Sequence, residues 1–167
     1  RTCWKRWACR CHWTRPPHRE MRRLWLIVGT AGDDVICGTA RNDLISPGAG
    51  NDVVYAGPGD DQDIVQDSPG NDKLYGEAGN DALFDGDGAD LLVGGPGNDV
   101  FNAVDPAGQA SPDTLQGGAG DDDFATLDRQ KDVVDGGAGT DKAYRDAGVD
   151  VLTNIEQTVG PGGQPAP

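Results

Sequence analysis

Aspartate recurs along this chain at intervals of nine residues, with glycine two positions before it and an apolar side chain two positions after it. The pattern is clearest in DGDGADLLV (85–93) followed by GGPGNDVFN (94–102), where glycine is fourth, aspartate sixth and an apolar residue eighth. Carboxylate oxygens at a fixed spacing, beside glycine-rich backbone, suit a hard cation that takes six to eight oxygen ligands. The residue types therefore predict calcium binding in preference to magnesium binding.

Thirteen units keep this phase, and glycine fills the fourth position in ten of them. A single aspartate in a turn is more often solvated or hydrogen-bonded within its own turn. A phased series of aspartates is not explained in that way, because each one would have to arise independently. The repeat therefore indicates a solenoid in which equivalent turns lie side by side.

Each unit divides into a polar turn of six residues and an extended piece of three, such as Lys73-Leu74-Tyr75. Glycine in the turn permits positive φ angles. In the extended piece the middle side chain points one way and its two neighbours the other. The apolar eighth residue is therefore expected to face inward, with the seventh and ninth facing outward.

Two such units make one coil of 18 residues, so the repeats predict an all-β solenoid of about six coils. Stacked coils would pair their short strands in parallel on two faces, with the eighth-position side chains filling the space between them. Alternate turns would then lie in two columns. The consequence is a column of aspartates along each edge.

The charge of the chain is strongly acidic and unevenly distributed. There are 14 Lys and Arg against 28 Asp and Glu, and eight of the basic residues lie within residues 1–25. The remaining acidic body should attract cations and repel nucleic acid and anionic membranes. No apolar run is long enough for a membrane span. Because stacked carboxylates repel one another, the chain without calcium is expected to be largely unfolded.

The nonapeptide GGxGxDxUx, with U an apolar residue, stands nearly whole in GGPGNDVFN (94–102), GGAGDDDFA (117–125) and GGAGTDKAY (136–144). It resembles the RTX or hemolysin-type calcium-binding repeat of secreted bacterial proteins, and the likeness covers about residues 27–156. The resemblance implies a parallel β-roll that holds several Ca²⁺ ions between turns of adjacent coils, in an extracellular protein. Carried onto this sequence, the implied ligands are the side chains of Asp34, Asp43, Asp52, Asp61, Asp72, Asp81, Asp90, Asp99, Asp122, Asp141 and Asp150, with turn backbone at Gly70, Gly79, Gly88 and Gly97.

Three segments of the chain differ from one another in composition. Residues 1–23 form a basic leader that is expected to be disordered, and residues 24–156 form the roll. Residues 103–112 break the period and are expected to protrude as a loop, and residues 157–167 form a flexible tail rich in Pro and Gly.

The expected function is that of a calcium-dependent structural or adhesive module without catalytic activity. Both histidines, His12 and His18, lie in the leader, and neither HExxH nor GxSxG occurs. One alternative is the repeat module of a larger secreted enzyme or toxin. Another is a surface on the outer face, with residues such as Tyr55 and Tyr75, that binds carbohydrate or a cell-surface protein.

Overall fold

The computed structural model of the chain describes residues 25–63, 69–104, 111–146 and 149–160, and these residues form strands and turns without a helix. The strands are β1 (Trp25–Val28), β2 (Val35–Cys37), β3 (Asp43–Ser46), β4 (Val53–Pro58), β5 (Gln62–Asp63), β6 (Lys73–Ala78), β7 (Ala82–Phe84), β8 (Leu91–Pro96), β9 (Val100–Asn102), β10 (Thr114–Ala119), β11 (Asp123–Thr126), β12 (Val133–Ala138), β13 (Lys142–Arg145), β14 (Val151–Thr153) and β15 (Gln157–Val159). None of these residues lies in a helix of the length and apolarity that a membrane span needs.

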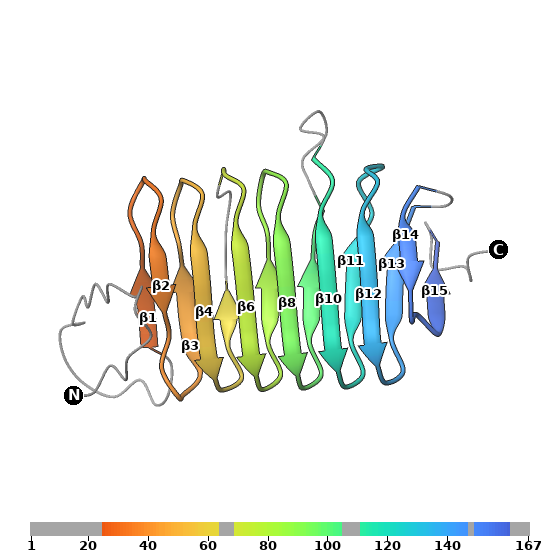
Figure 1. Cartoon of the computed structure of the whole chain (residues 1–167), viewed down its shortest axis with the longest axis horizontal. Helices are drawn as coiled ribbons and strands as arrows, with labels where there is room; N and C mark the ends of the chain where they lie inside the picture. Colours follow the sequence, from red (N-terminus) through yellow and green to blue (C-terminus); the bar gives the residue numbers. More distant parts are fainter. Residues whose placement is uncertain (1–24, 64–68, 105–110, 147–148, 161–167) are drawn as a thin grey trace.

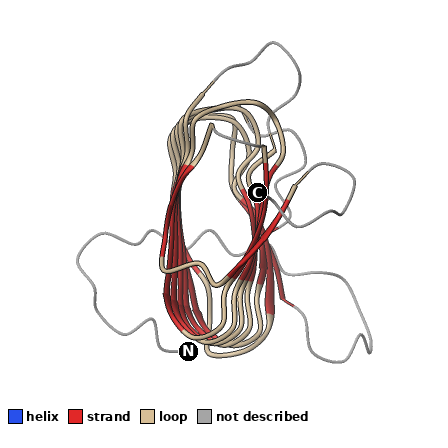
Figure 2. Cartoon of the chain, turned by 90° about the vertical axis from the view of Figure 1, so that its right-hand side faces the viewer, coloured by secondary structure: helices blue, strands red, loops and turns tan. Residues whose placement is uncertain are grey.

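The strands alternate between two parallel sheets, as the period of nine predicted. The odd-numbered strands form an eight-stranded sheet in the order β1-β3-β5-β7-β9-β11-β13-β15, and the even-numbered strands form a seven-stranded sheet from β14 to β2. Viewed along the solenoid axis, the two sheets lie on opposite sides of a flattened coil with turns at both ends (Figure 2). The all-β parallel solenoid of about six coils is therefore confirmed.

The core consists mainly of eighth-position side chains between the sheets, and Ala56 and Ala103 are also buried in it. It runs through Ile36, Val54, Leu74, Leu92, Leu115 and Val134 on one side and Ile45, Leu83, Phe101, Phe124 and Ala143 on the other. Phe101 and Phe124 stack with their ring centroids 4.6 Å apart. Because side chains alternate along each strand, the eighth residue is buried while its neighbours face outward, as expected.

The two edges of the solenoid differ in regularity. The turn segments at the end of the seven-stranded sheet form what we call the regular edge, along the bottom of Figure 1. In β4, β6, β8, β10 and β12 the segment begins within the last residues of the strand. The segments are residues 38–42, 56–60, 76–80, 94–98, 117–121 and 136–140. Turns that follow the eight-stranded sheet form the irregular edge, along the top, and include residues 29–33, 47–51, 85–89 and 127–131. Equivalent aspartates on adjacent coils are 18 to 23 residues apart, so coil length is less uniform than the predicted 18.

The second position of the regular-edge turns has a positive φ angle in every coil after the first. Gly95 and Gly118 adopt φ values of 121° and 115° there. Glu77 occupies the equivalent position with a φ of 76°. A side chain in the left-handed region costs about 1 kcal/mol or more, so this turn is strained where the sequence departs from glycine.

The C-terminal boundary of the roll lies beyond the predicted residue 156. Residues Gln157–Val159 form β15, which pairs in parallel with β13 through Lys142↔Gln157 and Tyr144↔Val159. This segment is therefore not a flexible tail, because a strand partner satisfies its backbone. The predicted leader, the centre of the predicted loop at residues 105–110 and the end of the chain from residue 161 lie outside the described residues.

Candidate metal centre

Two ladders of acidic residues run along the solenoid, one on each edge. Each acidic residue lies at the start of a strand, directly after a turn. Every coil therefore contributes one carboxylate to each edge. The regular-edge ladder consists of Asp43, Asp61, Asp81, Asp99, Asp122, Asp141 and Glu156. The irregular-edge ladder consists of Asp34, Asp52, Asp72, Asp90, Asp113, Asp132 and Asp150.

Backbone-to-carboxylate hydrogen bonds connect each ladder from coil to coil. The amide N–H of Asp81 donates to Oδ1 of Asp99, and that of Asp99 donates to Oδ1 of Asp122, both at 2.8 Å. The same bond joins every consecutive pair, with Glu156 Oε2 accepting from Asp141 N at the end of the regular edge. One oxygen of each carboxylate is therefore used to hold the next coil in register.

The second carboxylate oxygen has no such partner in the middle of the ladders. Oδ2 is buried without a hydrogen bond in Asp52, Asp61, Asp72, Asp81, Asp99, Asp122, Asp132 and Asp141. These residues are at most 2% exposed. A buried carboxylate oxygen without a partner costs several kcal/mol or shifts its protonation. The regular repetition of this oxygen indicates a place for a cation rather than a local defect.

Glycine at the first position of the regular-edge turns keeps this place open. A Cβ at Gly94 would lie 2.1 Å from Asp99 Oδ2 and 2.8 Å from the carbonyl oxygen of Gly117. A Cβ at Gly76 would lie 2.4 Å from Asp81 Oδ2 and 2.9 Å from the carbonyl oxygen of Gly94. A carboxylate from one coil and a carbonyl from the next therefore border the same small space. This all-oxygen surrounding fits calcium.

The fourth-position glycines that were predicted to supply turn backbone lie where adjacent coils touch. A Cβ at Gly79, Gly88 or Gly97 would lie 1.6 Å from the carbonyl oxygen of the fourth residue in the preceding coil, and one at Gly70 would lie 1.9 Å from Gly50 O. Gly97 N also donates to Ala119 O at 2.8 Å. The structure therefore gives these glycines a role in close stacking of the coils.

Burial raises the pKa of several carboxyl groups in the ladders. Desolvation is the largest cause, neighbouring carboxylates add to it, and the backbone N–H bond opposes it. The pKa rises to about 6 for Asp61 and Asp72 and to about 7 for Asp81, Asp122 and Asp132. The ladders therefore hold their negative charge at neutral pH only at a cost, which a cation between the coils would remove.

Three of the predicted ligands already have Oδ2 bonded to threonine, namely Asp34, Asp43 and Asp150. Thr39 donates its backbone N–H at 2.6 Å and its hydroxyl at 2.8 Å to Asp43 Oδ2. Thr30 makes the same two bonds to Asp34. Thr126 Oγ1 donates to Asp150 Oδ2 at 2.9 Å. These carboxylates differ from the rest of the ladders, because the protein itself supplies donors to the second oxygen.

All eleven predicted aspartates lie in the two ladders, and three further members were missed. Asp113 and Asp132 have the same sequence signal, since Leu115 and Val134 follow two residues later, but their turns lack the fourth-position glycine. Glu156 has neither the aspartate nor the apolar residue of the pattern. Only its position after the turn of the last coil could have indicated it.

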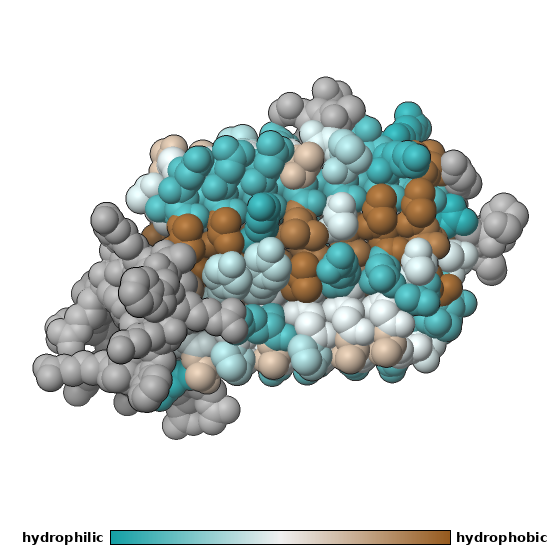
Figure 3. Space-filling model, viewed as in Figure 1, coloured by the Kyte–Doolittle hydropathy of each residue, from teal (hydrophilic) through white to brown (hydrophobic). Residues whose placement is uncertain are grey.

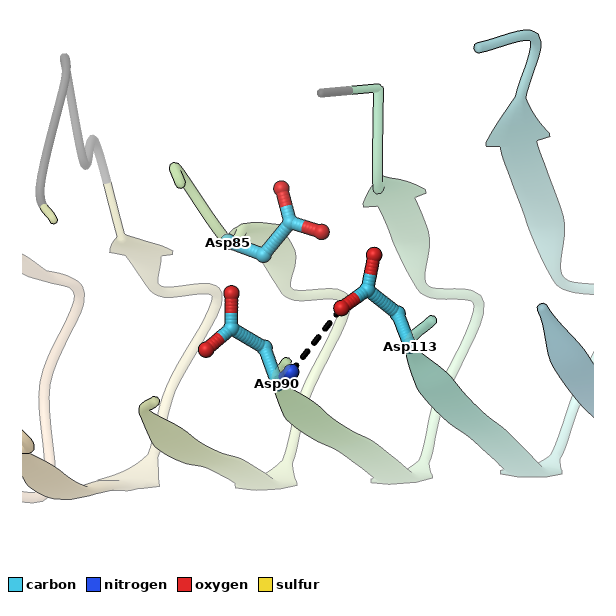
Figure 4. Close-up of side chains that lie close together, drawn as sticks. All are labelled: Asp85, Asp90 and Asp113. Atoms are coloured by element: carbon cyan, nitrogen blue, oxygen red, sulfur yellow. Dashed lines mark hydrogen bonds between the residues drawn. The ribbon is translucent and has the colours of Figure 1, made fainter. Parts of the chain in front are cut away.

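Additional carboxylates approach the ladder on the irregular edge. Asp85, at the first position of its turn, lies with Asp90 and Asp113 so that one oxygen of each is within 4.8 Å of the others (Figure 4). Asp90 N donates to Asp113 Oδ1 at 2.8 Å within this group. Asp128, Asp113 and Asp132 form a second group by the same criterion. Asp85 and Asp128 were missed because neither occupies the sixth position of a unit.

A family model agrees with this arrangement of turns. The model of the RTX calcium-binding nonapeptide repeat (4 copies) matches residues 28–63, 66–101, 107–128 and 123–152. The matched segments include every aspartate of the two ladders, while Glu156 lies beyond them. No curated protein and no solved structure matches the chain.

Proposed function

Because the chain belongs to the RTX calcium-binding nonapeptide repeat family, whose repeats imply calcium binding, we propose that calcium in its two ladders drives folding of an extracellular structural or adhesive module. The family is typical of secreted bacterial proteins, which supports an extracellular site of action. The calcium concentration outside a cell is also high enough to fill weak sites of this kind.

The observation that carries the proposal is the set of buried Oδ2 atoms without a hydrogen bond. Carboxylates stacked coil upon coil repel one another, and burial makes this repulsion stronger. When bound, calcium supplies the positive charge that offsets it. The residues of the chain supply the rest: the ladder N–H groups orient each carboxylate, and the first-position glycines leave room beside it. Binding and folding would therefore be coupled.

We propose that the module is not an enzyme. The regular phase of the aspartates is explained by their place at the start of each strand, so no pair of them needs a catalytic explanation. Neither histidine of the chain lies in the repeats. A structural role requires only the stack of coils itself.

The outer face of the seven-stranded sheet supports the adhesive part of the proposal. Tyr55 and Tyr75 are paired on β4 and β6, with their rings stacked at 5.0 Å and 8°. Val133 and Val151 are exposed further along the same sheet. Figure 3 shows apolar patches along the middle of this face beside a hydrophilic edge. Retention of the calcium-loaded chain on a polysaccharide or cell-surface fraction would support adhesion, and no retention would exclude it for that surface.

Circular dichroism of the full chain tests the folding proposal. In excess chelator we expect a mostly disordered far-UV spectrum, and on calcium titration a transition to β structure at about 10⁻⁴ to 10⁻³ M, with magnesium as the control cation. Magnesium should be much less effective because it requires six ligands at short distances. A β spectrum that is the same with and without chelator would contradict the proposal.

A further inference from the structure

The irregular-edge turn at residues 127–131 lacks the glycines that, on the regular edge, leave room for calcium beside the ladder carboxylate. Its sequence, LDRQK, contains no glycine, and it places Asp132 ten residues after Asp122 instead of nine. Leu127 occupies the first position, and its side chain is 40% exposed. Arg129 adopts a φ of 73°. The backbone here therefore departs from the conformation of the glycine turns.

The carboxylate of Asp128 lies beside the ladder at this turn. Gln130 N donates to Asp128 Oδ1 at 2.7 Å, which fixes the side chain within its own turn. Arg129 N donates to the carboxylate of Asp146, so the turn is also tied to the next irregular-edge turn. One oxygen of Asp128 lies within 4.8 Å of an oxygen of Asp113 and of Asp132. Two successive ladder carboxylates and one turn carboxylate thus converge.

Asp132 provides an independent indication that the group has a ligand. Its side chain is 0% exposed, and its Oδ1 accepts the amide N–H of Asp113 at 2.9 Å. Its Oδ2 is buried without a hydrogen-bond partner. A bound positive charge would stabilise a fully buried carboxylate oxygen of this kind, next to two more carboxylates.

We infer that Asp113, Asp128 and Asp132 form a cation site of a second kind, in which a turn carboxylate replaces the glycine turn of the regular edge. The ligand is a hard divalent cation, and calcium fits the all-oxygen donor set. Three carboxylates carry more negative charge than the one carboxylate and one carbonyl that border each regular-edge space. Because ligand charge tunes the affinity of calcium sites, this site binds calcium more tightly than the regular-edge spaces and fills before them. The inference rests on the proposed calcium binding of the ladders.

Calcium titration of the full chain by calorimetry tests this site with the variant Asp128→Asn. Asparagine keeps the oxygen that accepts from Gln130 N but removes the charge, so the turn is preserved. The matched control is Asp123→Asn, an exposed outward position on β11 with the same change of charge. We expect D128N to weaken the tightest calcium-binding step by about tenfold and D123N to leave it unchanged. Equal binding by the two variants would overturn the inference.

A third variant separates loss of charge from loss of structure. Asp128→Glu keeps the charge and should retain most of the affinity, whereas equal losses in D128E and D128N would mean that the turn and not the ligand was disturbed, which also overturns the inference. Far-UV circular dichroism at saturating calcium monitors folding in each case. If the wild-type chain itself binds no calcium, the proposed function fails, and that result is distinct from a failure confined to Asp128.

Discussion

The first coil and the central coils differ in what surrounds the second oxygen of the equivalent ladder carboxylate. In the first coil, Thr39 donates two hydrogen bonds to Oδ2 of Asp43. In the central coils, the residue at the position of Thr39 is Gly95 or Gly118, and Oδ2 of Asp99 or Asp122 is buried without a partner. One residue, four positions before the aspartate, therefore decides whether the protein or a cation completes the turn.

This difference has a backbone cause as well as a chemical one. Gly95 and Gly118 have positive φ values, which turn the local N–H groups to a different direction. Thr39 is not among the residues with positive φ, and both its N–H and its hydroxyl reach the carboxylate. Threonine thus changes the shape of the turn and fills the place that glycine leaves open. Dependence on calcium is therefore expected to be a property of individual coils.

The largest expected effect is a stabilisation of the calcium-free chain by acid. The pKa of Asp81, Asp122 and Asp132 is raised to about 7 in the folded state, against 3.8 for the ordinary side chain. The folded state therefore binds these protons more tightly than the unfolded state, so stability in chelator rises as pH falls from about 7 to about 4. For Asp43 the bonds from Thr39 oppose the rise in pKa.

Far-UV circular dichroism of the full chain in chelator at a series of pH values measures this effect, and β structure should increase as the pH falls from about 7 to about 4. The central coils should gain most, because several of their carboxylates titrate together, and amide exchange would locate the gain. With calcium present the direction reverses, since protons compete with the cation for the same oxygens. No gain of β structure in chelator on acidification from about pH 7 to about pH 4 would show that the ladders are not the source of the calcium dependence.

A methyl group at the first position of a central turn should have the next largest effect. Gly94→Ala places a Cβ 2.1 Å from Asp99 Oδ2 and 2.8 Å from the backbone of the adjacent coil, so we expect a loss of about 3 kcal/mol in the free energy of unfolding and weaker calcium binding. Gly32→Ala in the first coil is the control, because a Cβ there meets no atom within 4 Å. Denaturant unfolding at saturating calcium compares the two. Equal losses would mean that the space beside Asp99 has no special role.

The smallest expected effect is the loss of the threonine hydroxyl in the first coil. Thr39→Val removes the donor at 2.8 Å from Asp43 Oδ2 while keeping the shape of the side chain, and should lower the free energy of unfolding by about 2 kcal/mol. Thr39→Ser keeps the hydroxyl and serves as the control. Denaturant unfolding in calcium measures both variants. If the serine and valine variants had the same free energy of unfolding, the hydroxyl bond to Asp43 Oδ2 would not contribute to stability.

The structural features that repeat from unit to unit could be predicted from the sequence, because few folds are compatible with a period of nine residues. The inward side chains, the two parallel sheets and the two columns of aspartate follow from strand alternation and from pairing of equivalent units. Leu92 and Asp90 illustrate this, since each lies where its position in the unit predicts. The register survives the insertions, since the ladder bond still joins Asp52 to Asp72 and Asp90 to Asp113, which are 20 and 23 residues apart.

The features that do not repeat could not be predicted in the same way. The hydrogen bonds from Thr39 to Asp43 depend on the φ angle of one turn residue. The approach of Asp128 to Asp113 depends on a contact between coils. Glu156 lies in the ladder although its unit lacks the pattern, because strand β15 brings it beside Asp141. The approach of Asp128 to Asp113 and that of Glu156 to Asp141 each join residues that are 15 positions apart in the sequence.

The ladder bonds also make the sixth-position amides a set of spectroscopic probes. The N–H of Asp61, Asp81 or Asp99 donates to a side-chain carboxylate of the next coil and not to a backbone carbonyl. A hydrogen bond to an ionised acceptor is shorter and stronger, and it deshields the amide proton. The nuclear magnetic resonance signals of these amides would therefore report the ionisation of each ladder carboxylate separately, one coil at a time.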